Sequence, residues 1–210
     1  MPVVFTVFVA YFIGSIPTGY LVARARGIDI RSLGSGNIGA TNVFRTLGKG
    51  SGIFVLTVDG LKGYAGCMVW ECFVLLQPNN GSTPHDLEWL RIVGSMGAIL
   101  GHNYTCWLGF RGGKGIATSA GALVGLLPLP FLMTLTVWLV VFVVSRYVSL
   151  ASIAAAAVLP FSTLLCGKSN LMTGIAAAMS MLAIYKHKAN IRRLLDGTEN
   201  RIGKSSEGLG

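Results

Sequence analysis

Charged side chains are scarce in this sequence. Of 210 residues, only 12% are Asp, Glu, Lys or Arg, whereas 52% are hydrophobic, and the mean hydropathy is +0.64. Soluble domains carry about 25% charged residues, so this composition excludes an ordinary soluble domain and predicts an integral membrane protein. Apolar runs cover most of the chain and leave no stretch for a separate soluble domain. We therefore expect one membrane domain over 1–210.

Acidic residues are the rarer charged group, with 8 Asp and Glu against 17 Lys and Arg. The only close acidic pairs are Asp86 with Glu88 and Asp196 with Glu199. Because Mg²⁺ needs several oxygen ligands gathered at one place, this scarcity argues against a CDP-alcohol phosphotransferase and against a two-metal hydrolase. We expect neither a metal nor a cofactor.

Several catalytic motifs are also missing. No histidine has an aspartate five positions later, which excludes the His–Asp pair of HxxxxD acyltransferases, and GxSxG and GxxxxGK[ST] do not occur. These absences argue against an acyl-serine mechanism and against ATP hydrolysis of the P-loop type. The four cysteines have no CxxC spacing, and we interpret them as small apolar residues.

The N-terminus lacks the short basic leader and the small-residue cleavage site of a secretory signal, so we interpret its apolar run as the first transmembrane helix. At Pro128 and Pro130 the run LLPLPF either breaks one long span or separates two short ones. Separation keeps the basic C-terminal segment on the same side as the other basic loops. Seven spans are therefore predicted, at about 3–23, 52–76, 90–108, 116–128, 131–145, 148–166 and 170–185.

Lysine and arginine mark the predicted cytoplasmic loops. The first long loop holds Arg24, Arg26, Arg31, Arg45 and Lys49. The positive-inside rule then predicts an all-α polytopic bundle with the N-terminus outside and the C-terminus in the cytoplasm. We expect 200–210 to be a disordered tail. The net charge of +9 is interleaved with the spans, so it indicates orientation and an anionic substrate or lipid headgroup, and no nucleic acid is expected.

The first polar loop reads GSGNIGATNVFR over 34–45. Glycines such as Gly36 let successive backbone N–H groups point into one concavity, which makes a nest for an anion. Arg45 adds a planar guanidinium suited to phosphate. Further neutral donors in this stretch are Ser35, Asn37, Thr41 and Asn42.

Two more polar clusters fall on the same predicted membrane face. In GFRGGKG, Gly112 and Gly113 free the backbone beside the cation Lys114. His187, Asn190 and Arg193 are spaced i, i+3, i+6 and form an oblique stripe on a continuing helix. Ser149 and Ser152 share a face at the start of the sixth span, where helix-packing hydroxyls are the alternative. Such loops can align two phosphorylated reactants without a metal or a protein nucleophile.

Taken in order, the motifs GSIPTGYL, GSGNIGATNVFR, DGLKG, GHNYTCWLGFRGGKGIAT, RYVSLAS and HKANIRRLLDGTENRIG resemble those of the acyl-phosphate-dependent glycerol-3-phosphate acyltransferases, the PlsY family. The resemblance covers nearly the whole chain. It implies transfer of a fatty acyl group from acyl phosphate to the 1-hydroxyl of glycerol 3-phosphate, giving lysophosphatidic acid and inorganic phosphate. It also implies a place in the bacterial inner membrane, with the active site on the cytoplasmic side.

Carried over by this resemblance, the catalytic residues are Ser35, Arg45, Lys114 and His187. The substrate-binding residues, to which we add Ser149 and Arg193 from the patterns above, are Gly36, Asn37, Thr41, Asn42, Gly112, Gly113, Ser149, Ser152, Asn190 and Arg193. Either a substrate phosphate, whose second pKa is near ~6, or His187 accepts the proton of the attacking hydroxyl. The expected partners are the two substrates and the lipid bilayer. The sequence leaves the oligomeric state open, with a monomer as one option.

A membrane transporter or exchanger of a phosphorylated small molecule is the competing class, because basic pockets at helix ends also serve transport. It predicts substrate counterflow in sealed vesicles without a covalent product. The clusters argue against it, since they fall on one membrane face whereas alternating access places a site near the midplane.

Overall fold

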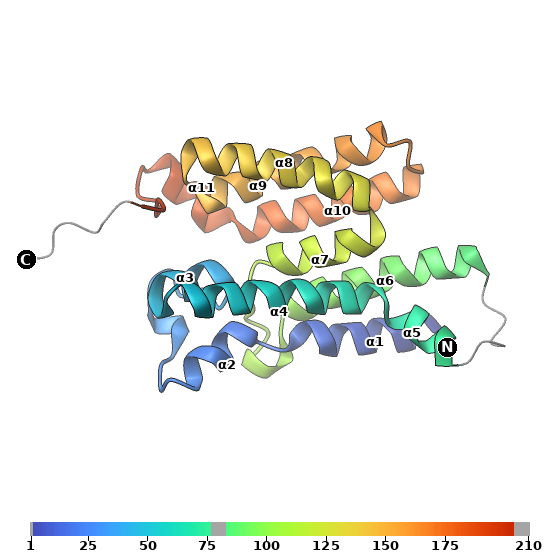
Figure 1. Ribbon diagram of the computed structural model, residues 1–210, viewed down its shortest axis with the longest axis horizontal. Coiled ribbons are helices and arrows are strands. Elements are labelled where there is room, and N and C mark those ends of the chain that lie inside the picture. The colour runs from blue at the N-terminus through green and yellow to red at the C-terminus, as the bar shows by residue number, and fades with distance from the viewer. Residues whose placement is uncertain (1, 77–82, 204–210) are drawn as a thin grey trace, which may run out of the picture. The chain divides into compact units, whose positions relative to one another are not determined.

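The computed structural model describes residues 2–76 and 83–203, and within this part every regular element is a helix (Figure 1). The all-α prediction is therefore confirmed. The chain forms two compact units, Met1–Pro128 and Leu129–Gly210. Residues 204–210, most of the predicted disordered tail, lie outside the described residues.

The first unit contains seven α-helices and two short 3₁₀ helices in its described part. In chain order these are α1 (Pro2–Ser15), α2 (Thr18–Arg24), η1 (Ile30–Ser32), α3 (Ala40–Leu47), α4 (Lys49–Cys67), α5 (Val69–Leu76), α6 (Pro84–Asn103), η2 (Cys106–Leu108) and α7 (Ile116–Leu126). The helices that follow are α8 (Pro128–Ser145), α9 (Val148–Leu165), α10 (Asn170–Lys186) and α11 (Lys188–Leu195).

Each predicted span corresponds to one helix or to a broken helix. The first, 3–23, is interrupted between α1 and α2 at Pro17, which cannot donate a backbone hydrogen bond. The second, 52–76, is the pair α4 and α5, bent by 56°. At LLPLPF two helices form, because α7 ends at Leu126 and α8 begins with Pro128, a residue that the first turn of a helix tolerates.

Three helical stretches of the described chain are long and apolar enough to cross a membrane: Pro2–Arg24, Pro128–Ser145 and Val148–Leu165. A fourth is added if the bent pair α4 and α5 crosses as one span. The remaining helices are shorter or more polar, as in α6, which carries Asp86, Glu88 and Arg91. The count of seven spans and the orientation of the termini stay predictions.

Small residues set the packing of the first unit, in which α1, α4, α6 and α7 lie side by side (Figure 1). A Cβ added at Gly14 of α1 would overlap the backbone of Ala98 of α6, and one at Gly121 of α7 would overlap the carbonyl oxygen of Gly60 of α4. Close backbone approach of this kind is how helices associate in lipid, where burial of apolar surface gives little driving force.

A buried apolar cluster supports the polar loop between η1 and α3. Its members come from α2, η1, the loop itself, α3 and α4, and they are Ala23, Ile30, Ile38, Val43 and Val55. Each is at most 4% exposed. Because this cluster anchors the loop at Ile38 and at both of its ends, the polar residues between η1 and α3 occupy fixed positions.

Candidate active site

Asn42 holds the first polar loop together. Its side chain is almost fully buried, at 2% exposed. The Nδ2 group donates to the carbonyl oxygens of Leu33 at 2.9 Å and Ile30 at 3.3 Å, and Oδ1 accepts from the Ser35 amide at 2.9 Å. Sequence reasoning expected Asn42 to donate to a substrate. In the structure its Nδ2 group instead donates to two backbone carbonyls at the start of the loop, so Asn42 stabilises the loop conformation.

The backbone amides of this loop are engaged within it. The Gly36 amide donates to the Leu33 carbonyl at 2.9 Å, and the Gly39 amide donates to Asn37 Oδ1 at 2.8 Å. Gly36 has a φ of +68°, which glycine adopts without strain. The sequence predicts that these amides point to a bound anion. In the structure the amides of Ser35, Gly36 and Gly39 donate to protein acceptors instead. The glycine serves the tight turn.

The second polar loop, around Gly112 and Gly113, packs against the C-terminal end of α6. The Gly112 amide donates to the Asn103 carbonyl at 3.2 Å, and the Gly113 amide donates to the His102 carbonyl at 3.1 Å. A Cβ at either glycine would overlap His102. Here too the nest interpretation needs correction, since these amides point to α6. Glycine is required because the loop backbone lies directly against that helix end.

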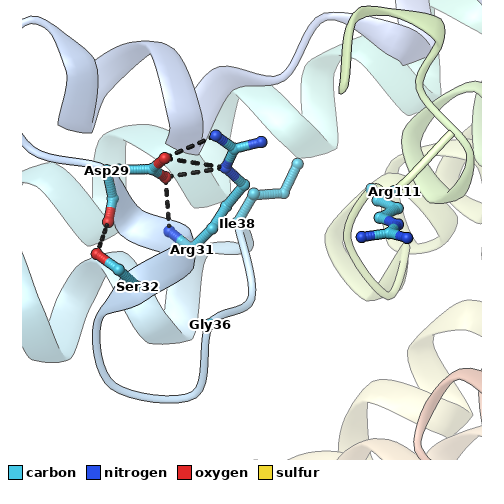
Figure 2. Close-up of a pocket in the computed structure, with 7 residues that line it drawn as sticks. Asp29, Arg31, Ser32, Gly36, Ile38 and Arg111 are labelled. Atoms are coloured by element: carbon cyan, nitrogen blue, oxygen red, sulfur yellow. Dashed lines mark hydrogen bonds and ion pairs between the residues drawn. The ribbon is translucent and has the colours of Figure 1, made fainter. Parts of the chain in front are cut away.

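Both loops line one open cleft in the first unit (Figure 2). The cleft has a volume of about 460 Å³. Its lining residues are Asp29, Arg31, Ser32, Gly36, Ile38, Arg111 and Gly112. Figure 2 shows Arg111 on its own loop, across from the Asp29 and Arg31 pair. The structure thus brings the predicted residues Gly36 and Gly112 to one cleft, together with two guanidinium groups.

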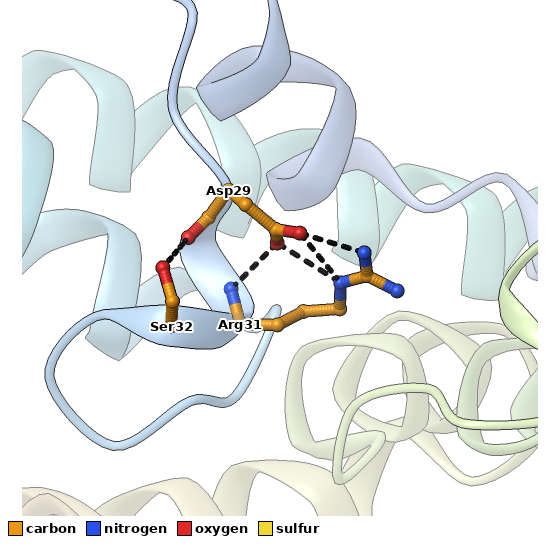
Figure 3. Close-up of polar contacts among 3 residues, drawn as sticks. All are labelled: Asp29, Arg31 and Ser32. Atoms are coloured by element: carbon orange, nitrogen blue, oxygen red, sulfur yellow. Dashed lines mark hydrogen bonds and ion pairs between the residues drawn. The ribbon is translucent and has the colours of Figure 1, made fainter.

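Asp29 fixes the position of Arg31 (Figure 3). The guanidinium donates to both carboxylate oxygens, with Nη2 to Oδ2 at 2.6 Å and Nε to Oδ1 at 2.9 Å, and it also stacks over the Tyr20 ring at 5.0 Å. The hydrogen bonds from Arg31 lower the pKa of Asp29 to about 2. Ser32 Oγ donates to the Asp29 carbonyl at 2.8 Å. A guanidinium held in this way is ready to meet an anion without further ordering.

The other predicted residues of the first unit flank these loops. Thr41 lies in the first turn of α3 and Arg45 in its last turn, whereas Lys114 precedes α7. All three side chains are half-buried, and Ser35 is exposed. A partly desolvated cation interacts more strongly with phosphate than a fully hydrated one, so these positions suit Arg45 and Lys114 to phosphate binding.

In the second unit, three predicted residues meet at Glu199. Its Oε1 accepts from Ser149 Oγ at 2.9 Å and from Asn190 Nδ2 at 2.8 Å, and its Oε2 accepts from Arg193 Nε at 2.7 Å. Burial by itself would raise the pKa of Glu199, but the hydrogen bonds from Asn190, Arg193 and Ser149 outweigh it and lower the pKa. The carboxylate therefore stays ionised and ties α9 to α11 and to the segment after it.

His187 lies at the break between α10 and α11, so the predicted stripe does not run along one continuing helix. Its side chain is 3% exposed, and Nδ1 lies 2.8 Å from the Ala183 carbonyl oxygen. A carbonyl can only accept, so Nδ1 carries a proton and Nε2 is the acceptor nitrogen in the neutral ring. Ser152 accepts from Trp138 Nε1 at 3.1 Å and donates to the Val148 carbonyl at 2.8 Å, as a packing hydroxyl does.

Sequence reasoning missed Glu199 and Arg31. Glu199 was noted only as one of a sparse acidic pair, and Arg31 only as a topology signal. The prediction of a disordered tail from residue 200 also misses a tertiary contact. In the described part, 200–203, the Ile202 amide donates to the Arg146 carbonyl at 3.0 Å. The sequence held little signal for Glu199, because Asp196 lies nearer to the two arginines and the partner Ser149 is distant in the chain.

Comparison with known proteins assigns the family. Residues 4–197 match the model of the glycerol-3-phosphate acyltransferase family. The chain is 46% identical over 194 residues to the glycerol-3-phosphate acyltransferase of Geobacter sulfurreducens, covering 92% of this chain and 94% of that protein. It is 45% identical over 196 residues to that of Desulforamulus reducens, covering 93% and 92%.

The fold also matches a solved structure. A crystal structure of PlsY, an integral membrane glycerol 3-phosphate acyltransferase, in its glycerol 3-phosphate form superposes with a TM-score of 0.85 at 38% identity, covering 97% of this chain and 96% of that one. The lysophosphatidic acid form of PlsY gives a TM-score of 0.82. Since the family model matches residues 4–197 and the relatives cover more than nine-tenths of the chain, this membrane protein belongs to the glycerol-3-phosphate acyltransferase family.

Proposed function

We propose that this protein transfers a fatty acyl group from acyl phosphate to the 1-hydroxyl of glycerol 3-phosphate. The products are lysophosphatidic acid and inorganic phosphate, the first acylation step of bacterial phospholipid synthesis, and no CoA takes part. The observation that carries the proposal is the cleft at which two glycine loops meet beside Arg31 and Arg111. Family membership supports glycerol 3-phosphate as the acceptor.

In the proposed step, the acceptor hydroxyl attacks the acyl carbonyl carbon, a new ester bond forms, and the bond from that carbon to the phosphate oxygen breaks. Inorganic phosphate leaves with the electron pair. Arg45 and Lys114 neutralise the charge on the two phosphates, and the Ser35 hydroxyl orients one of them. Catalysis then comes from alignment and charge stabilisation, which together are worth several orders of magnitude in rate.

Two groups are candidates for the proton of the attacking hydroxyl: a substrate phosphate and His187. The Nδ1 contact of His187 with Ala183 leaves Nε2 as the acceptor nitrogen of the neutral ring, which keeps this alternative chemically sound. His187→Gln separates the two. If His187 is the base, the variant loses the pH step in kcat/KM. A loss of rate that is flat across roughly pH 6–9 assigns the proton to the substrate.

We also propose that residues 1–210 form a single membrane domain and that the residues around Glu199 take part in substrate binding. Asn190 and Arg193, held by Glu199, are then substrate-binding residues along with Ser149. The bilayer arrangement that we propose has seven spans, the N-terminus outside, the C-terminus inside and the active site on the cytoplasmic side of the bacterial inner membrane. Impermeant thiol labelling of single cysteines introduced near each terminus tests this topology.

The donor comparison tests the function. Purified protein is incubated with labelled glycerol 3-phosphate and either acyl phosphate or acyl-CoA, without added metal. Lysophosphatidic acid formed only with acyl phosphate supports the proposal. Product formed only with acyl-CoA overturns the choice of donor. No product with either donor, together with counterflow of glycerol 3-phosphate in sealed vesicles, would assign the protein to transport.

A further inference from the structure

Three ionisable side chains are buried together in the first unit, below the second polar loop. Asp59 and Lys62 lie one turn apart on α4, and His102 lies in the last turn of α6. They are 2%, 5% and 5% exposed. Charged groups are rarely placed in such surroundings unless they have a specific role or partner, and the reaction proposed above uses none of the three.

The contacts join three elements of the unit. Lys62 Nζ lies 2.8 Å from Asp59 Oδ1 and donates at 2.8 Å to the carbonyl oxygen of Ile16, at the break between α1 and α2. His102 Nδ1 lies 3.8 Å from the same Asp59 oxygen. The carboxylate therefore lies between an ammonium group and an imidazole. Lys62 links α4 to the N-terminal helices by its hydrogen bond, whereas the imidazole of α6 packs beside the carboxylate at a distance too long for a hydrogen bond.

The imidazole also forms part of the surface under the loop. Its Nε2 occupies the space into which a Cβ at Gly113 would project, so the Gly113 Cα packs on the ring. The Gly113 amide donates to the His102 carbonyl, which fixes the same residue from the backbone side. Lys114 follows directly. The backbone that carries the Lys114 side chain thus rests on His102, and His102 faces Asp59.

We propose that His102 is a positioning residue for Lys114, with the Asp59 and Lys62 pair packed beside its ring. This inference rests on the proposed function, in which Lys114 binds a substrate phosphate. The ring touches no substrate. It sets where the ammonium group of Lys114 stands, and a phosphate contact is sensitive to displacements of about 1 Å.

His102→Ala is the direct test, because removal of Asp59 would leave Lys62 as an unpaired buried charge and destabilise the unit. Weakened phosphate binding in both the ground state and the transition state raises KM and leaves kcat less affected. We expect KM for glycerol 3-phosphate or acyl phosphate to rise about tenfold, with kcat within about threefold. If His102→Ala does not fold, His102→Gln replaces it, since it also removes the ring.

Gly94→Ala is the control for a merely structural effect. Its new methyl group overlaps the Gly66 carbonyl in the α4 and α6 contact, eight residues before His102 on α6, so it lowers stability. The folded fraction is expected to keep the wild-type KM. An equal rise of KM in Gly94→Ala and His102→Ala would overturn the positioning role, as would an unchanged KM in His102→Ala when Lys114→Ala raises it.

Two double variants test the contact between Gly113 and the His102 ring by thermal unfolding in detergent, without any activity readout. The methyl of Gly113→Ala would meet the His102 ring, whereas that of Gly112→Ala would meet the His102 backbone carbonyl. His102→Ala is therefore expected to relieve Gly113→Ala and not Gly112→Ala. If His102→Ala reduces the loss of Tm in neither glycine variant, or in both equally, the contact between Gly113 and the His102 ring is refuted. A wild-type protein that makes no lysophosphatidic acid would refute the proposed function alone, since this comparison would still stand.

Discussion

Glu199→Gln is a nearly isosteric change that removes one buried negative charge. The carboxylate accepts three hydrogen bonds, from Ser149, Asn190 and Arg193. An amide has one accepting oxygen, so in either orientation its NH₂ group faces a donor. The variant loses at least one hydrogen bond of the charge-assisted kind, worth about 1.5–3 kcal/mol, and leaves the Arg193 guanidinium without its counter-charge.

We therefore expect Glu199→Gln to lower the free energy of unfolding by about 2–4 kcal/mol. For a chain of this size that corresponds to a drop in Tm of roughly 5–15 °C, measured by thermal unfolding in detergent. Asp196→Asn is the matched control. Its pair with Arg192 is exposed, with side chains 58% and 87% accessible and the charged atoms 3.9 Å apart, so little change is expected.

The pH dependence of stability gives a second test of the role of Glu199, and its direction follows from the pKa shift. The folded-state pKa of Glu199 is lowered, so its ionised form contributes stability that is fully present above the unfolded-state pKa, near ~4.3. This contribution is lost as the pH falls through the folded-state value. The Tm difference between wild type and Glu199→Gln is thus expected to be full at pH 7 and to narrow below about pH 4.3. Equal Tm values at pH 7, or a difference that does not narrow in acid, would refute the assignment.

Three further variants test the helix packing and the first polar loop. Gly121→Ala, whose methyl group overlaps the Gly60 carbonyl, is expected to lower stability by about 1–3 kcal/mol, whereas Gly174→Ala, with no atom within 4 Å of its new Cβ, is expected to be neutral or stabilising; equal Tm shifts would contradict the packing. Asn42→Asp keeps the acceptor for the Ser35 amide but turns a carboxylate toward two loop carbonyls. We expect a loss of roughly 2–4 kcal/mol and faster proteolysis of the loop, and an unchanged cleavage rate would count against the supporting role.

Much of the helical fold follows from composition, because a chain in lipid has to satisfy its backbone hydrogen bonds within helices. The seven apolar runs accordingly match helices or broken helices of the structure. The start of α6 was placed six residues late, at 90 instead of Pro84. Its first turns are polar, and Thr83 forms a capping box with Asp86 that stabilises them.

The roles of the loop residues depended on partners that are distant in the sequence. The glycine pattern indicated free backbone amides, yet the acceptors of Gly112 and Gly113 are carbonyls of α6, and no local pattern identifies them. Likewise the sequence predicts that Asn42 donates to a substrate, whereas in the structure its side chain donates to the carbonyls of Ile30 and Leu33. The residue types were informative about polarity, whereas the direction of each hydrogen bond is set by tertiary structure.

Product formation in Arg45→Ala and Lys114→Ala, compared with the wild type, tests the central claim most directly. Each protein is incubated with acyl phosphate and labelled glycerol 3-phosphate, and lysophosphatidic acid and released inorganic phosphate are measured together. We predict that the wild type forms the two products in equal amounts and that each variant loses most of the activity while it still unfolds cooperatively. Phosphate release without lysophosphatidic acid, or full activity in both variants, would contradict the account.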